Sequence, residues 1–183
     1  MRRYYFAKPY ADAVARLRVP SGFLLVVAFA WFADPTPVSL LYGLCLSVAG
    51  LWLRGWAAGH LAKNEDLATS GPYRFLRNPL YLGTLIVAAG LVLASRQIGL
   101  AILFAAVFAL IYLPVIEQEE QHLRKLFPSF DRYAQAVPLL WPTFSFPGGG
   151  KRFRWSLYLH NQEYQALLGF LAGAVLLAWK AWR

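Results

Sequence analysis

The sequence has little cysteine and few acidic side chains. It contains one cysteine, Cys45, which lies inside an apolar segment, and nine acidic residues against 18 basic ones. A single cysteine excludes a disulfide within one chain and disfavours a thiol-based active site. We therefore interpret Cys45 as a small, buried hydrophobic residue. Charged residues occupy only 15% of the 183 positions, which is low for an ordinary soluble domain.

Apolar side chains take the place of the missing charge. Hydrophobic residues make up 58% of the chain, and the mean hydropathy is +0.44. A transmembrane helix needs roughly 20 apolar residues, or somewhat fewer with flanking anchors and local thinning of the bilayer. The apolar stretches are 19–33, 37–53, 80–94, 98–116 and 164–179. They predict one all-α membrane domain over residues 1–183, an integral membrane bundle of about five transmembrane helices.

The basic residues indicate the orientation of this bundle. With five spans, one face of the membrane receives Arg96, Lys180 and Arg183, and the opposite face receives the remaining arginines and lysines. The positive-inside rule then predicts a cytoplasmic N-terminus. The net charge of +9 is explained by attraction to the headgroups of anionic membrane lipids, so no nucleic-acid partner is needed.

Two segments are typical of a membrane interface. Residues 1–18 mix tyrosines with basic residues, as an interfacial segment does; a cleaved signal peptide is the alternative, which the long charged lead disfavours. Trp52, Arg54 and Trp56 predict an aromatic and basic belt at the cytoplasmic interface.

The segment 67–83, LATSGPYRFLRNPLYLG, is a polar and turn-rich hinge between apolar stretches. Its residues 69–72 form a turn signal, and Asn78 followed by Pro79 predicts a helix N-cap and first helical residue. The positive end of that helix faces back toward Tyr73 and Arg77. The hinge is therefore a candidate anion site.

A helical hairpin connects the hinge with a second polar segment. Ser95, Arg96 and Gln97 form a short turn, which makes the flanking helices antiparallel and returns residues after 116 to the level of the hinge. The helix after this turn is expected to continue past the membrane toward Phe127. Residues 133–150, which contain three prolines and three glycines, are expected to form a loop.

Helical geometry distinguishes the carboxylates on the second leg of the hairpin. At 100 degrees per residue, Glu119 and Glu120 fall within or at the margins of the apolar arc, whereas Glu117 is turned toward the polar side. An unpaired buried carboxylate costs several kcal/mol, so a partner is expected, and Arg77 is the natural candidate. The pair could serve catalysis, or it could only join two helices.

Two sets of residues in this region carry a family resemblance. The first, arranged as T-S-G-x-Y-x-x-x-R-N-P-x-Y-x-G, comprises Thr69, Ser70, Gly71, Tyr73, Arg77, Asn78, Pro79, Tyr81 and Gly83. The second comprises Glu119, Glu120, Leu123, Phe127, Tyr133, Val137, Pro138 and Pro142. Together they resemble the signatures of the membrane-embedded, S-adenosylmethionine-dependent methyltransferases, which include isoprenylcysteine carboxyl methyltransferase and the phospholipid N-methyltransferases. The resemblance covers roughly residues 67–144, and Asn78 stands where these enzymes frequently have histidine.

The resemblance implies a methyl transfer from S-adenosylmethionine to a lipophilic acceptor, with S-adenosylhomocysteine as product and no metal. It implies that Arg77 orients the acceptor or the cofactor carboxylate, and that Glu120 fixes Arg77 or binds the cofactor's ammonium group. Asn78 is either a cofactor contact or only a helix cap. The further cofactor-binding candidates are Tyr73, Tyr81, Glu119, His122 and Tyr133. The pocket is expected to open to the cytoplasm, and the acceptor to enter from the membrane.

Two other functions are compatible with this sequence. Sterol reductases that use NADPH resemble the family in hairpin topology, and a noncatalytic membrane scaffold could keep the same fold. Residues 145–183, a linker followed by a C-terminal helix, lie outside the resemblance, so Glu163 and His160 receive little weight. Gly169 and Gly173 predict a close helix-packing face, either within the fold or in a dimer.

Overall fold

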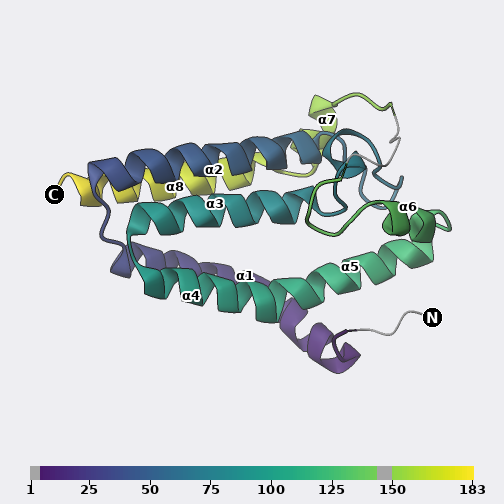
Figure 1. Ribbon diagram of the computed structural model, residues 1–183, viewed down its shortest axis with the longest axis horizontal. Helices are drawn as coiled ribbons and strands as arrows, with labels where there is room; N and C mark the ends of the chain where they lie inside the picture. Colours follow the sequence, from purple (N-terminus) through teal and green to yellow (C-terminus); the bar gives the residue numbers. More distant parts are fainter. Residues whose placement is uncertain (1–4, 144–149) are drawn as a thin grey trace.

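The computed structural model describes residues 5–143 and 150–183, and its long helices run along one common axis (Figure 1). The long elements are α1 (Lys8–Phe32), α2 (Pro37–Ala58), α3 (Pro79–Ser95), α4 (Ile98–Val107), η2 (Phe108–Tyr112), α5 (Leu113–Leu126) and α8 (Tyr164–Ala181). The short ones are η1 (Gly71–Arg74), α6 (Phe130–Ala136) and α7 (Trp155–His160). No strand occurs in the described ranges, and the predicted all-α class is confirmed.

Four helices are long and apolar enough to cross a membrane: α1, α2, the continuous helix Ile98–Leu126 and α8. The fifth apolar helix, α3, has 17 residues and is shorter than these. The hairpin turn is confirmed, because α3 ends at Ser95, Arg96 adopts a left-handed conformation with φ 56°, and α4 begins at Ile98. The expected continuation of the second leg is confirmed as well, through the π-helical η2 into α5.

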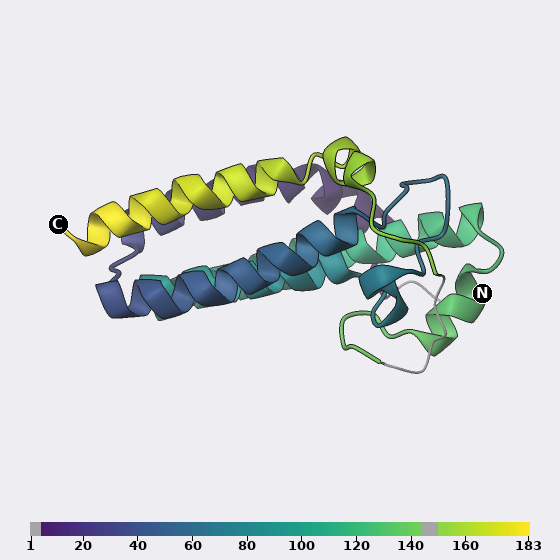
Figure 2. The same ribbon diagram turned by 90° about the horizontal axis from the view of Figure 1, so that it is seen from above.

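The helices form two layers. α2, α3 and α4 lie in one layer, and α8 and α1 lie in the other (Figure 2). We call the end of the bundle at the turn between α3 and α4 the turn end, and the end that carries η1, α6 and α7 the hinge end. The C-terminus lies at the turn end and the start of α1 at the hinge end (Figure 1), as an odd number of spans requires.

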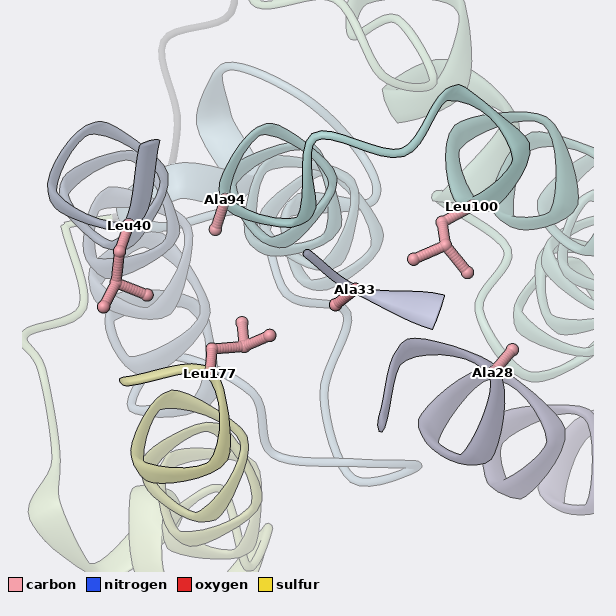
Figure 3. Close-up of a cluster of buried hydrophobic side chains, with 6 residues drawn as sticks. All are labelled: Ala28, Ala33, Leu40, Ala94, Leu100 and Leu177. Atoms are coloured by element: carbon pink, nitrogen blue, oxygen red, sulfur yellow. The ribbon is translucent and has the colours of Figure 1, made fainter. Parts of the chain in front are cut away.

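At the turn end, side chains from both layers meet in one apolar cluster. It consists of Ala28, Ala33, Leu40, Ala94, Leu100 and Leu177, which come from α1, α2, α3, α4, α8 and the residue that follows α1 (Figure 3). Polar contacts close the same end: the Lys180 ammonium donates to the carbonyl oxygens of Ala30 and Trp31, at 3.1 and 3.2 Å. This end therefore joins the two layers through apolar packing and the Lys180 hydrogen bonds.

The closest helix packing is between α2 and α3, along a seam of four glycines. A Cβ atom on Gly43 would lie 2.4 Å from the carbonyl oxygen of Gly90, and one on Gly50 would lie 2.7 Å from that of Gly83. Between these contacts, the Ser47 hydroxyl donates to the Val87 carbonyl at 2.9 Å. Only glycine allows two helix backbones to approach this closely.

The packing face expected on α8 is not used within the fold. A Cβ atom on Gly169 or Gly173 would have no neighbour within 4 Å. The prediction that these glycines pack inside the bundle was wrong, because α8 contacts the other helices through a different face that buries Leu177. The dimer alternative stays a prediction.

Three other expectations need correction. Cys45 is exposed, because α2 buries Leu40, Gly43 and Ser47 and thereby turns Cys45 to the outer surface. Helix α1 begins at Lys8, well before the apolar stretch, with Pro20 inside the helix. Residues 133–136, expected to begin the loop 133–150, form the end of α6. Residues 144–149, which include the start of the linker, lie outside the described residues.

Candidate active site

The hinge folds around a tight turn that requires glycine. Gly71 has φ +57°, and a Cβ atom there would lie 2.4 Å from the His60 ring. The His60 Nδ1 lies 3.1 Å from the Ser70 hydroxyl, which is itself buried. This packing fixes the start of η1, and η1 buries Pro72 and Tyr73.

The two signature segments are hydrogen-bonded directly to each other. The backbone amides of Arg77 and Asn78 donate to the carbonyl oxygens of Pro138 and Leu139, at 2.9 and 3.2 Å. The Tyr133 hydroxyl donates to the Tyr73 carbonyl at 2.6 Å. Segments about 60 residues apart in the chain thus form one unit at the hinge end.

An ion pair joins the hinge to α5. Arg77 Nε lies 2.8 Å from Glu120 Oε1, and the two side chains are 12% and 15% exposed. The predicted pairing is confirmed. Arg77 also donates from Nη1 to the Ala134 carbonyl at 2.6 Å. Its Nε, although close to the carboxylate, makes no hydrogen bond of good geometry in the described structure and has no exposed surface.

Asn78 occupies the N-cap position of α3, but its side chain caps nothing. The amide Nδ2 instead donates to Glu120 Oε1 at 3.3 Å. Of the two expectations for Asn78, a side-chain cap is therefore wrong, because the side-chain amide bonds to Glu120 and its oxygen accepts from no amide of the first turn of α3. The first turn of α3 is left without a capping side chain, so its free amide groups keep the positive end of the helix available.

The neighbouring carboxylate, Glu119, binds a different pair of residues. The Tyr81 hydroxyl donates to Glu119 Oε1 at 3.0 Å, and Arg18 Nη1 lies 3.4 Å from the same oxygen. Arg18 and Glu119 are about half exposed, so they form the rim of the site. We call Arg77, Asn78, Glu119, Glu120 and the first turn of α3 the hinge site.

Glu117 points away from the hinge site, as its angular position predicts. Its carboxylate accepts hydrogen bonds from the backbone amides of Tyr5 and Phe6, at 2.7 and 3.0 Å. The polar face of α5 is therefore covered by the N-terminal segment instead of open solvent. Glu117 anchors that segment.

A cavity of about 700 Å³ lies at the hinge end and is lined by both signatures. All eight candidates from the sequence border it: Tyr73, Arg77, Asn78, Tyr81, Glu119, Glu120, His122 and Tyr133. His122 is exposed at the edge, whereas Tyr73 and Tyr133 are buried. Its volume falls in the range of small-molecule sites, roughly 300–1,000 Å³.

Burial favours the protonated form of Tyr73 and Tyr133 at the hinge end. It raises the pKa of Tyr73 above its ordinary value, and the nearby Tyr133, Glu119 and Glu163 raise it further while Arg54 opposes them. Burial also raises the pKa of Tyr133, which Arg77 lowers and Glu120 raises. Both hydroxyls are therefore neutral hydrogen-bond donors at physiological pH.

Sequence reasoning missed one wall of the cavity. It is formed by Arg54, Asn161 and Glu163, which we call the C-terminal wall. Arg54 does not belong to an interfacial belt as expected, because its guanidinium turns inward to Glu163. An arginine and a glutamate bordering apolar helices are each costly near a membrane, and this cost was the available signal that they pair.

The family of the chain follows from comparison with known proteins. Residues 38–129 match the family model described as phospholipid methyltransferase, which is half of the chain. The chain belongs to this family. The matched range contains the hinge and the hairpin, together with Glu119 and Glu120. As a member of a membrane-protein family with four candidate spans, the chain is an integral membrane protein.

Three curated relatives are similar to parts of this chain. The nickel-cobalt-cadmium resistance protein NccN of Alcaligenes xylosoxydans xylosoxydans is 36% identical over 106 residues, 57% of this chain and 49% of that protein. The cobalt-zinc-cadmium resistance protein CzcN of Cupriavidus metallidurans is 36% identical over 110 residues, which are 60% of this chain and 50% of that protein. The protein-S-isoprenylcysteine O-methyltransferase of Schizosaccharomyces pombe is 28% identical over 137 residues, which are 72% of this chain and 58% of that protein.

These matches are partial. The chain spans about half the length of the curated relatives it matches. No solved structure matches it. Two of the relatives are named for metal resistance, yet within residues 5–143 and 150–183 no group of three or more histidine, cysteine, aspartate or glutamate residues could hold a metal ion.

Proposed function

We propose that this protein is a membrane methyltransferase that moves the methyl group of S-adenosylmethionine to a lipophilic acceptor. The main structural support for this proposal is that the two signatures are hydrogen-bonded to each other around one cavity at the hinge end. Membership of the phospholipid methyltransferase family and the similarity to an isoprenylcysteine O-methyltransferase support the same reaction class.

The hinge site fits the amino-acid end of such a cofactor. That end carries a carboxylate and an ammonium group. The uncapped first turn of α3 and the Arg77 guanidinium are suited to the carboxylate. Glu120 and Glu119 are suited to the ammonium group, and Asn78 holds Glu120 in place.

The protein's role in the reaction is positioning. S-adenosylmethionine supplies a methyl group on a sulfonium centre, and in-line transfer depends mainly on how the two reactants are held. We assign Arg77 and Glu120 to that task. Tyr73, Tyr81, His122 and Tyr133 complete the pocket, and the apolar helices that border it admit a lipophilic acceptor with a carboxylate, amine, thiol or phenol group.

We further propose that the hinge end is cytoplasmic. The turn end carries Arg96, Lys180 and Arg183, and the other basic residues of the described chain lie toward the hinge end. This asymmetry follows the positive-inside rule. It is tested by labelling a single cysteine at Arg96, which is exposed, in a Cys45→Ala background; Ser95 is unsuitable because it is fully buried. Labelling of Arg96→Cys from the cytoplasmic side would contradict this orientation.

Ligand binding by the purified protein in detergent tests the function. We expect S-adenosylhomocysteine to raise the melting temperature and to give a calorimetric binding signal that Arg77→Ala weakens. NADPH serves as the competing ligand. Stabilisation by NADPH alone would favour a reductase, and no response to either ligand would favour a scaffold; both results would contradict a methyltransferase.

A further inference from the structure

Arg54 and Glu163 form a second ion pair at the cavity, separate from the hinge site. Arg54 Nε donates to Glu163 Oε1 at 2.5 Å and Nη2 donates to Oε2 at 3.0 Å. Arg54 Nη1 donates to the Thr84 hydroxyl and the Leu80 carbonyl. The two side chains are 22% and 8% exposed. Every nitrogen of this guanidinium thus has a partner, and the pair is electrically neutral as a unit.

The segment before α8 is held firmly against the end of α2. Asn161 Nδ2 donates to the carbonyl oxygens of Ala58 and Leu61, at 3.0 and 2.9 Å. The Arg154 amide donates to the Gly59 carbonyl at 2.9 Å. These bonds satisfy carbonyl groups at and just after the C-terminal end of α2. They also hold the segment so that Glu163 lines the cavity. The family match ends at residue 129, so it assigns no role to this segment.

Tyr73 borders the same cavity with an unused polar group. Its side chain is 6% exposed, and its hydroxyl makes no hydrogen bond with any residue in the ranges 5–143 and 150–183. Because Tyr73 lines the cavity, its hydroxyl can hydrogen-bond to a ligand bound there. Tyr73 lines the cavity together with Glu119 of the hinge site and Glu163 of the C-terminal wall.

The two ends of the cavity therefore offer different chemistry. The hinge site presents a helix N-terminus and charged groups, which suit a zwitterion. The C-terminal wall has a neutralised ion pair beside the neutral Tyr73 hydroxyl, which suits an uncharged group rich in hydrogen-bonding atoms. Adenosine has these properties.

We propose that the adenosine end of the cofactor lies against the C-terminal wall, that the Tyr73 hydroxyl hydrogen-bonds to it, and that Glu163 is a positioning residue that acts through Arg54. This inference rests on the proposed methyltransferase function. It adds the segment before α8 to the cofactor pocket and gives the bound cofactor a direction.

Two ligands test the direction. S-adenosylhomocysteine has both ends, whereas 5′-methylthioadenosine lacks the amino-acid end. We expect Tyr73→Phe to weaken the calorimetric affinity for both ligands about tenfold, because one hydrogen bond is lost in each complex. Arg77→Ala should weaken S-adenosylhomocysteine binding only. The melting temperature of Tyr73→Phe without ligand should equal that of the wild type, since no protein hydrogen bond is removed.

Glu163→Gln tests the positioning role. We expect it to lower the affinity for both ligands by tenfold or more. Glu163→Asp keeps the charge and should bind both ligands more tightly than Glu163→Gln does. Asp131→Asn is the matched control: it breaks the more exposed Arg124–Asp131 pair away from the cavity and should leave both affinities unchanged. A lower melting temperature for Glu163→Gln with wild-type affinity would mean a structural role alone.

The outcomes separate the two proposals. A wild-type protein that does not bind S-adenosylhomocysteine would defeat the proposed function. If the wild type binds it, unchanged affinities in Tyr73→Phe would overturn the present inference by itself. A Tyr73→Phe effect confined to S-adenosylhomocysteine would overturn it too, and so would undetectable binding of 5′-methylthioadenosine by the wild type. Either result would mean that the adenosine end makes no contact with Tyr73 at the C-terminal wall.

Discussion

The glycine seam between α2 and α3 and the cavity at the hinge end are built in opposite ways. Along the seam, a Cβ atom on Gly43 or Gly50 would meet the facing backbone within 3 Å, and few polar side chains are involved. At the hinge end, charged residues surround about 700 Å³ of open volume. Tight packing stabilises one region, while the other keeps polar groups apart for a ligand. Stability and binding should therefore be separable by mutation.

The largest effect is expected in the seam. Gly43→Leu places a side chain where the Gly90 carbonyl and Ala94 lie, so the helices must separate. We expect a loss of at least about 3 kcal/mol in stability, or roughly 10 °C in melting temperature, measured in detergent. Gly173→Leu is the matched control on the open face of α8 and should not lower the melting temperature. Equal losses in both variants would remove the distinction between the two glycine faces.

The next effect is expected at the hinge site. Arg77→Ala and Glu120→Gln each remove one side of the ion pair, and we expect S-adenosylhomocysteine affinity to fall by about 10- to 100-fold. Most incorporation of labelled methyl groups into membranes should be lost as well. The purified variants should stay folded, as judged by melting temperature. A destabilised variant with normal ligand affinity would show that the pair only joins the hinge to α5.

The smallest effect is expected from Glu117→Gln. This variant weakens the attachment of the N-terminal segment at Tyr5 and Phe6, with a cost of about 1 kcal/mol, or 2–4 °C in melting temperature. Ligand affinity should not change, because Glu117 does not border the cavity. A clear loss of affinity would mean that the N-terminal segment contributes to the site.

Local patterns in the sequence were enough to predict the helices, the hairpin turn and the meeting of the two signatures. Apolar length marks a membrane helix, and Ser95, Arg96 and Gln97 mark the turn. Helical angle distinguished Glu120 from Glu117, and the structure pairs Glu120 with Arg77. These predictions succeeded because apolar length, turn residues and helical angle are local patterns, and the short turn at Ser95, Arg96 and Gln97 returns the second signature to the level of the first.

The features that were missed depend on contacts between distant helices. In a soluble helix the apolar face identifies the buried side, but a membrane helix is apolar on all sides, so neither the seam of Gly43 and Gly50 nor the exposure of Cys45 could be deduced. Arg54 and Glu163 are 109 residues apart and follow no fixed spacing. Only the fold brings them to the same cavity.

The continuous helix Ile98–Leu126 relates the site to bilayer thickness. Its 29 residues extend about 43 Å, against about 30 Å of hydrocarbon in a typical bilayer. With Ile98 set at one edge of the hydrocarbon, Glu119 lies about 32 Å along this helix, near the opposite edge. Because the helix is continuous, Glu119 and Glu120 stay at a fixed distance from Ile98. A bilayer of longer-chain lipids would therefore surround both carboxylates with hydrocarbon, and a bilayer of shorter-chain lipids would leave them in water. The length of the surrounding lipids thus becomes a variable of the site's electrostatics.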